Sequence, residues 1–292
     1  MKSGFVSIVG RPNVGKSTLL NNIIGHKVAI TSDVAGTTRN TIQGIYHDKD
    51  KQIVFVDTPG IHKPQHKLGR ILNKQAYLSL YDVDVVLFLI DATTKLGKGD
   101  MFVLDVLRQT NKSVILVINK IDKLSKEEIM FKINEYKDLY NFDHIVPVSA
   151  LKKDNIARLL LLIDGYLKDN IKYYDETVIT SNTKNFLISE YIREKVFTLT
   201  TEEIPHSVAC VIEKLEEKKD IVNINAMIVV DRENVKKIII GKQGIMIKEI
   251  GTLARKDIEY LLGKKVFLEL YVKVIPKWRD KERYLNKLGF NK

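Results

Sequence analysis

The segment GRPNVGKS at residues 10–17 constrains this chain more than any other. It matches the pattern G-x-x-x-x-G-K-[ST], and it follows a β-branched run at residues 5–10 that is typical of a buried strand. In such a loop, backbone N–H groups surround a phosphate at the N-terminus of the helix that follows. The motif therefore predicts a strand–loop–helix unit with a phosphate site. The residues expected to line that site are Gly10, Arg11, Pro12, Asn13, Val14, Gly15, Lys16, Ser17 and Thr18.

Strand-like and helical segments alternate along the first half of the chain. Continuous apolar runs at residues 83–91 and 113–120 are typical of strands inside parallel sheets. A polar turn, DKDK, divides residues 42–57 into two further strands, and a last short strand is expected at 144–150. The alternation predicts a doubly wound α/β domain with a mostly parallel sheet over residues 1–169.

The periodicity fades over residues 170–184, which we interpret as a linker. A different order of elements then predicts a smaller α+β domain over residues 185–292. The expected elements are a helix at 184–198, strands at 206–216 and 221–231, helices at 235–240 and 245–262, a strand at 264–275 and a helix at 279–288.

Positive charge is concentrated near the C-terminus. The net charge of the 292 residues is +11, and residues 232–292 hold 16 Lys and Arg against 7 Asp and Glu. This distribution indicates a polyanionic partner for the second half.

The single cysteine, Cys210, excludes an internal disulfide and favours a reducing cytoplasm. It lies in an apolar alternation, so we interpret its thiol as a core group rather than a nucleophile. No run approaches the ~20 apolar residues that span a bilayer, and the strand-like start leaves no room for a signal peptide. We therefore expect a cytoplasmic protein.

The segment NKID at residues 119–122 predicts the base of the bound nucleotide. The Asp122 carboxylate would accept hydrogen bonds from N1–H and the 2-amino group of guanine, whereas adenine offers no donor at either place and would leave the carboxylate unpaired. Asn119 would bond N7, the stem of Lys120 would cover the base, and Ile121 completes the segment. We therefore expect GTP and GDP as ligands.

Two further loops are expected at the phosphates. In the segment Asp57, Thr58, Pro59, Gly60, the carboxylate would hold Mg²⁺ and the Gly60 N–H would contact the γ-phosphate. A threonine of the segment GTTR would also ligate Mg²⁺; we favour Thr38, with Thr37 as the alternative. The expected magnesium ligands are thus Ser17, Thr38 and Asp57.

The segment Ser149, Ala150, Leu151 ends the last strand, where backbone N–H groups meet guanine O6. Together with the four segments above, it resembles the translation-factor-related GTPases over residues 5–165, which implies a P-loop GTPase domain. Such relatives include Ras-like proteins with a water-orienting glutamine after the DTPG-type motif, where this chain has Ile61. Hydrolysis is therefore expected to be slow unless another group or a partner assists it.

No general base is visible, so catalysis is expected from charge stabilisation. The residues expected to contribute are Lys16, Thr38, Asp57, Gly60 and Asn13. Asn13 resembles the asparagine that helps to hold K⁺ beside the phosphates in some such GTPases; the alternative is that it only adopts the backbone angles of the loop.

The segment GKQG at residues 241–244 lies between two expected helices. This pattern resembles a type II KH domain, whose G-x-x-G loop clamps single-stranded RNA; the alternative is a structural turn without a ligand. For Trp278 we weigh stacking on a base against packing in the core. The RNA-binding residues expected from the resemblance are Gly241, Lys242, Gln243, Gly244, Lys248 and Arg255.

Taken together, the motifs PNVGKS, GTTR, DTPGI, NKID, SAL and GKQG and the ending WRDKERYLNKLGF resemble the Era family of bacterial GTPases over nearly the full length. The resemblance implies a monomer that binds 16S ribosomal RNA near its 3′ end and assists assembly of the small (30S) ribosomal subunit. It also implies peripheral association with the inner face of the cell membrane. Two rival functions are an ATPase that remodels RNA and a non-enzymatic switch whose second domain binds protein.

Overall fold

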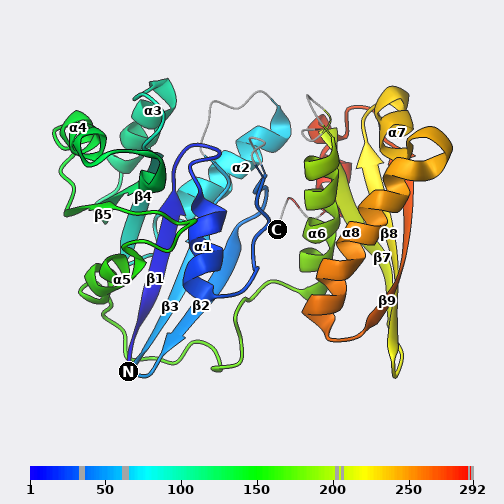
Figure 1. Ribbon diagram of the computed structural model, residues 1–292, viewed down its shortest axis with the longest axis horizontal. Helices are drawn as coiled ribbons and strands as arrows, with labels where there is room; N and C mark the ends of the chain where they lie inside the picture. The colour runs from blue at the N-terminus through cyan, green and yellow to red at the C-terminus, as the bar shows by residue number, and fades with distance from the viewer. Residues whose placement is uncertain (33–36, 61–65, 201–203, 205–206, 289, 291–292) are drawn as a thin grey trace. The chain divides into compact units, whose positions relative to one another are not determined.

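The computed structural model describes residues 1–32, 37–60, 66–200, 204, 207–288 and 290 (Figure 1). The chain divides into two compact units. The first holds residues 1–65 and 69–181, and the second holds residues 66–68 and 182–292. Each unit is described by itself below.

The sheet of the first unit has the strand order β2-β3-β1-β4-β5-β6. Only β2 runs antiparallel to its neighbour, and the other pairs are parallel. This mostly parallel sheet confirms the predicted doubly wound fold. Its strands are β1 (Lys2–Val9), β2 (Ile42–Asp48), β3 (Lys51–Asp57), β4 (Val85–Asp91), β5 (Ser113–Asn119) and β6 (His144–Pro147).

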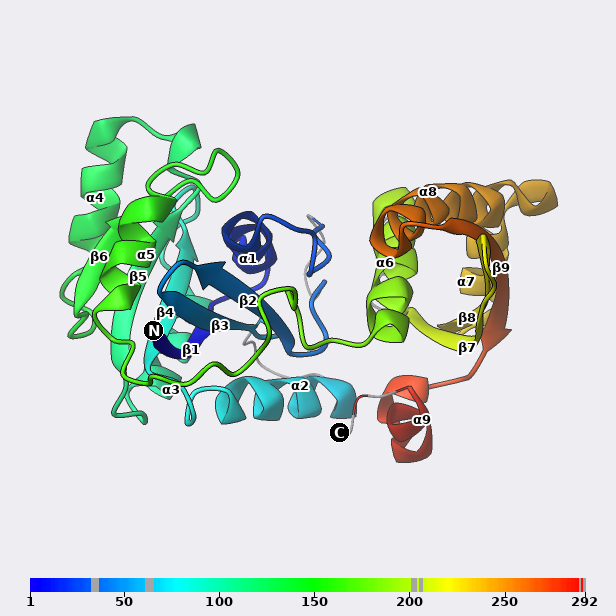
Figure 2. The same cartoon turned by 90° about the horizontal axis from the view of Figure 1, so that it is seen from below.

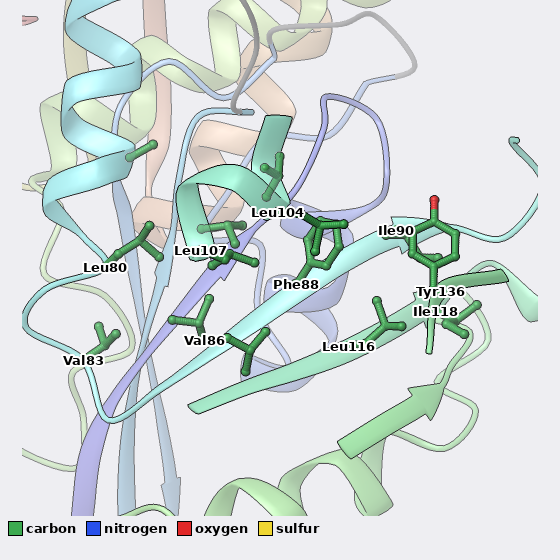
Figure 3. Close-up of a cluster of buried hydrophobic side chains, with 14 of the residues drawn as sticks. Leu80, Val83, Val86, Phe88, Ile90, Leu104, Leu107, Leu116, Ile118 and Tyr136 are labelled. Carbon is green, nitrogen blue, oxygen red and sulfur yellow. The ribbon is translucent and has the colours of Figure 1, made fainter. Parts of the chain in front are cut away.

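Helices cover both faces of this sheet (Figures 1 and 2). One face of β4 and β5 packs against apolar side chains of α2, α3 and α4, as the close-up in Figure 3 shows. Helices α1 and α5 lie on the opposite face (Figure 2). The helices are α1 (Lys16–Ile24), α2 (Lys67–Leu78), α3 (Lys98–Leu107), α4 (Lys126–Tyr136) and α5 (Ile156–Asp164).

The parallel register brings the predicted motifs to one edge of the sheet. Asp57 at the end of β3 stands opposite Ile8 of β1, and Asn119 at the end of β5 stands opposite Asp91 of β4. Because the carboxyl ends of parallel strands meet at this edge, loops far apart in sequence form one site there.

Residues 170–181, most of the linker predicted at 170–184, belong to the first unit. The side chain of Gln52 is buried; it accepts hydrogen bonds from the N–H groups of Tyr173 and Tyr174 and donates one to the Tyr174 carbonyl. Further along, Ile45 N donates to Ile179 O at 2.9 Å. Several backbone N–H and C=O groups of this segment are thus hydrogen-bonded to β2 and β3, whereas in a free linker they would be hydrated.

The second unit has a three-stranded sheet in the order β7-β8-β9, with one antiparallel and one parallel pair. Its long helices lie on one face of the sheet (Figure 2). This is the smaller α+β arrangement that the sequence predicts, and α8 has the predicted bounds. The elements in chain order are α6 (Lys184–Leu199), β7 (Ala209–Glu217), β8 (Ile221–Val230), α7 (Glu233–Ile240), α8 (Ile245–Leu262) and β9 (Lys265–Val274).

The end of the chain differs from the single helix predicted at 279–288. A short 3₁₀ turn, Trp278–Asp280, precedes α9 (Glu282–Lys287), because Lys281 between them has an extended backbone. Trp278 is fully buried and its indole N–H donates to Ser207 O at 2.8 Å. The core interpretation of Trp278 is therefore correct, and its stacking on a base is excluded by burial.

Burial also raises the pKa of the Cys210 thiol, with the Glu190 carboxylate adding to the effect. A thiol held in its protonated form is a poor nucleophile, which agrees with the core interpretation. Within the described ranges, no helix has the length and apolar character required to cross a bilayer.

Candidate functional site

The loop between β1 and α1 has backbone geometry that its glycines make possible. Gly15 has φ of 101°, and a Cβ there would lie 2.2 Å from Nδ2 of Asn119. Gly10 has φ of 155°, and a Cβ there would lie 2.3 Å from the Leu89 carbonyl oxygen. The loop therefore packs directly on the neighbouring strand ends, with α1 starting at Lys16 and pointing its N-terminus at the loop.

Lys16 lies inside this loop. Its Nζ donates to the carbonyl oxygens of Gly10 at 3.3 Å and Arg11 at 3.0 Å, and the side chain is buried. Burial lowers the pKa of Lys16, and the Asp57 carboxylate opposes that shift. An anion in the loop would relieve the cost of burying this ammonium group.

The three predicted magnesium ligands come together from three separate segments. Ser17 Oγ donates to Asp57 Oδ2 at 2.7 Å, and Ser17 Oγ lies 2.9 Å from Thr38 Oγ1. The structure therefore brings Thr38, the favoured threonine, to this cluster. Burial raises the pKa of Asp57 to about 6, while Lys16 and the hydroxyls of Ser17 and Thr38 act in the opposite direction.

The cluster fits a small hard cation. Asp57 is fully buried, and among the described residues no donor reaches its Oδ1. A buried carboxylate oxygen without a donor, beside two hydroxyls, offers the all-oxygen donor set that Mg²⁺ prefers when phosphates and water complete its shell. The described ranges hold no group of three or more His, Cys, Asp or Glu that suits a metal ion.

The segment after Asp57 passes close to the phosphate loop. Thr58 Oγ1 donates to Ile8 O at 3.0 Å, which fixes the end of β3 to β1. A Cβ on Gly60 would lie 2.8 Å from the backbone nitrogen of Pro12, so glycine permits this approach. Ile61, the next predicted site residue, lies outside the described residues.

On the base side, Asn119 ties three loops together. Its Nδ2 donates to Val14 O at 2.7 Å, and its Oδ1 accepts from Ala150 N at 2.9 Å. Asn22 of α1 also donates to the Ala150 carbonyl. The predicted base-binding segments thus share hydrogen bonds with the phosphate loop, although Leu151 itself is largely exposed.

Asp122 and Lys120, the other two polar residues of NKID, are also held in place by neighbouring side chains and backbone groups. Ser149 Oγ donates to Asp122 Oδ1 at 2.5 Å, and Ser149 is fully buried. Lys120 Nζ donates to Asn13 O at 2.9 Å and pairs with Asp91 Oδ2 at 2.6 Å. Burial opposes ionisation of Asp91, but hydrogen bonds from Lys120 and Thr93 outweigh it and hold the Asp91 pKa below its usual value.

Two acidic residues at this site were not predicted from the sequence. Asp91 supports Lys120, and Asp100 lies 2.9 Å from the Arg11 guanidinium. The position of Asp91, at the end of an apolar parallel strand, is a signal that would have found it. Asp100 lies in the first turn of α3 and carries no comparable signal.

In the second unit, the loop between α7 and α8 depends on its glycines in two different ways. Gly241 has φ of 73°, and a Cβ there would lie 2.7 Å from Met246 Cβ, so the loop is closely packed at this point. Gly244 has φ of 78°, and no atom of a described residue lies within 4 Å of a Cβ position there. The side chains of Lys242, Gln243, Lys248 and Arg255 are all exposed beside this loop and along α8.

Comparisons with known proteins agree with this geometry. Residues 5–120 match a family described as 50S ribosome-binding GTPase, and residues 203–279 match the KH domain family. One similar solved structure is a variant of Aquifex aeolicus Era bound to GDP·AlF4⁻, and another is Era in complex with MgGDPNP and nucleotides 1506–1542 of 16S ribosomal RNA. Each is 43% identical to this chain, covers 99% of both chains and has a TM-score of 0.96.

The raised pKa of Asp57 predicts a pH dependence for the stability of the nucleotide-free protein. Between pH 4 and 6 the folded state keeps a proton on Asp57 that the unfolded chain has lost, so this group's contribution to stability falls as pH rises. Relative to Asp57→Asn, the unfolding free energy of the unsubstituted chain should fall by about 2 kcal/mol from pH 4 to 7. Urea unfolding of both proteins measures it, and parallel profiles would contradict it.

Proposed function

Because this chain belongs to the Era family of GTPases, we propose that it hydrolyses GTP at the first unit and binds 16S ribosomal RNA near its 3′ end through the second. Membership rests on 43% identity to Era structures over 99% of both chains. The family matched at residues 5–120 carries a description that names the large subunit, but that match covers less than half of the chain. The full-length likeness therefore favours the small subunit as the partner.

One observation carries the enzymatic part of the proposal. Ser17, Thr38 and Asp57 lie more than fifteen residues apart in sequence, yet their oxygens converge beside the buried ammonium group of Lys16. This arrangement suits a Mg²⁺-bound triphosphate and has no evident purpose without one. Mg²⁺, when bound there, would neutralise charge on the phosphate oxygens.

The residues of the chain would then act by position and charge. Lys16 would leave the carbonyls of Gly10 and Arg11 and donate to the β- and γ-phosphate oxygens, and Gly60 N–H would donate to the γ-phosphate. Thr38 and Asp57 would hold the ion, and none of these groups would take a proton from water. Hydrolysis would depend on stabilising charge in the transition state.

Guanine would be selected by Asp122, which Ser149 orients. With one carboxylate oxygen held by the Ser149 hydroxyl, the group is fixed before the base arrives, so little side-chain freedom is lost on binding. Asn119, already bonded to Val14 and Ala150, would link recognition of the base to the shape of the phosphate loop.

We further propose that residues 31–41 and 60–70 respond to the presence or absence of the γ-phosphate and reposition the second unit. The bound nucleotide would then control RNA binding during assembly of the 30S subunit. The proposed domains span 1–169 and 185–292. A cytoplasmic monomer with peripheral membrane association is also proposed, from the family likeness and the charge of the second half.

Potassium is proposed as a second cofactor, with Asn13 supplying a ligand oxygen. Asn13 has φ of 65°, so its backbone conformation alone would also favour asparagine or glycine. The variant Asn13→Gly keeps that conformation and removes the side-chain oxygen. We expect faster GTP turnover in K⁺ than in Na⁺, and loss of this difference in Asn13→Gly; equal turnover of the unsubstituted chain in both salts would contradict the proposal.

The substitution Asp122→Asn tests the choice of base. It turns an acceptor into a donor, which fits xanthine, because xanthine carries a carbonyl at C2 in place of the amine. GTP affinity should fall by roughly 100-fold, the effect of about 3 kcal/mol for polar groups left unpaired where the bound base excludes water. Affinity for XTP should rise, as measured by competition with a fluorescent nucleotide. If the variant keeps its affinity for ATP and the unsubstituted chain prefers ATP, the ATPase alternative is correct.

RNA binding is tested by Gly244→Asp, with Gly263→Asp as a matched control. Both glycines have positive φ, and no described residue lies near a Cβ position at either; they cap opposite ends of α8, about 28 Å apart. A carboxylate at Gly244 should weaken binding of an oligonucleotide copying the 16S 3′ end by at least about tenfold, since it repels phosphate. The control should bind as the unsubstituted chain does. Equal binding by both variants would favour a protein partner for this unit.

A further inference from the structure

The Arg11 side chain, in the phosphate loop, is directed into the protein rather than left available to phosphates. Its Nε lies 2.9 Å from Oδ1 of Asp100 at the start of α3, and its Nη2 donates to Thr94 Oγ1 at 2.8 Å. The Asp100 side chain has no exposed surface and that of Arg11 is 24% exposed. The charge of Arg11 is therefore matched by a buried carboxylate.

The chain around Asp100 is shaped to hold this guanidinium. A Cβ on Gly99 would lie 2.5 Å from Arg11 Cδ, and a Cβ on Gly97 would lie 3.3 Å from Arg11 Nη1. Asp100 Oδ2 also accepts from Gly97 N at 3.0 Å, which closes the turn before α3. The two glycines thus leave the space that the Arg11 side chain fills.

Residues 91–100, the segment between β4 and α3 with the first turn of α3, also contact the phosphate loop at a second point. Thr94 Oγ1, which accepts from Arg11, itself donates to Asp91 O at 3.1 Å. The Asp91 carboxylate pairs with Lys120, and Lys120 donates to Asn13 O. Residues 91–100 therefore reach the phosphate loop at Arg11 and, through Lys120, at Asn13.

Side chains of α4 in turn hold residues 91–100 in place. Lys132 Nζ donates to Thr94 O at 2.7 Å. Tyr136, buried in the core shown in Figure 3, has its pKa raised by burial and by the neighbouring Asp100 carboxylate. A shift of the Arg11 side chain would disturb this packed layer, because buried charges tolerate the loss of a partner poorly.

We propose that residues 91–100 position the phosphate loop by their contacts with Arg11 and, through Lys120, with Asn13; we call this segment the bracket. Asp100, acting through Arg11, thereby controls the rate at which guanine nucleotide dissociates. Arg11 is a positioning residue, and its guanidinium does not bind phosphate. The inference rests on the nucleotide site proposed above.

The opposite arrangement, in which Arg11 leaves Asp100 and binds the nucleotide, has different consequences. Asp100→Asn would then free the guanidinium for phosphate and slow nucleotide release. Under the bracket arrangement the same change loosens the loop and speeds release. The direction of the effect therefore distinguishes the two.

The experiment measures release of a fluorescent GDP analogue from the full chain with Mg²⁺, well below the unfolding temperature. We expect release about tenfold faster in Asp100→Asn, within the range usual for coupled sites. The matched control is Asp105→Asn on the same helix, where an exposed carboxylate pairs with Arg108. It should release at the unsubstituted rate. Unchanged or slower release in Asp100→Asn overturns the bracket, as does an equal effect in the control.

A second set of variants avoids dependence on a single carboxylate that the fold itself needs. Thr94→Val removes the two hydrogen bonds of the Thr94 hydroxyl, to Arg11 and to Asp91 O, and should speed release in the same direction. Gly99→Ala should speed release when Arg11 is present and have little further effect in Arg11→Ala, because the added methyl group then no longer meets Cγ and Cδ of Arg11. Additive effects of Gly99→Ala and Arg11→Ala overturn the inference. Failure of the unsubstituted chain to bind the analogue would instead overturn the proposed function.

Discussion

The side chain of Asn119 is the interaction on which the nucleotide site depends. Its amide group bonds Val14 in the phosphate loop and Ala150 beyond β6. The phosphate side and the base side of the proposed nucleotide site are therefore both hydrogen-bonded to Asn119. This is possible only because β1, β5 and β6 are parallel and end at the same edge of the sheet. The absence of a Cβ at Gly15, which would lie 2.2 Å from Asn119 Nδ2, allows the loop to come so near. Sheet direction, glycine placement and one amide are thus parts of a single arrangement.

Much of this site could be predicted from the sequence because its motifs are local and their chemistry is fixed by phosphate, magnesium and guanine. Thr38 is an instructive case: sequence alone left Thr37 as an alternative, and only the fold shows that the Thr38 hydroxyl lies 2.9 Å from Ser17 Oγ. Asp100 was missed because its partner, Arg11, lies on another segment, and the pairing of Asp91 with Lys120 also joins two segments, although the position of Asp91 at a strand end was a usable signal. Pairings between segments depend on tertiary packing, which periodicity and spacing do not encode.

The second unit shows the same limit in its backbone. The order of helices and strands followed from hydrophobic patterning, and α8 was predicted to the residue. The break between Trp278–Asp280 and α9 was not predicted, because it depends on the extended conformation of Lys281 and on burial of the indole against Ser207. Similarly, the sequence presents Gly241 and Gly244 as equivalent, whereas in the fold only Gly241 makes room for a neighbouring residue, Met246.

The segment that follows α5 has a consequence for self-association. β2 is an edge strand, and an edge strand offers unpaired N–H and C=O groups to any extended chain that meets it. Here Ile179 accepts from Ile45, Thr180 bonds Gln43 O, and Val178 O bonds the His47 ring, so part of that edge is already taken. Residues 178–180 of the first unit therefore also shield part of this sheet edge against intermolecular strand pairing.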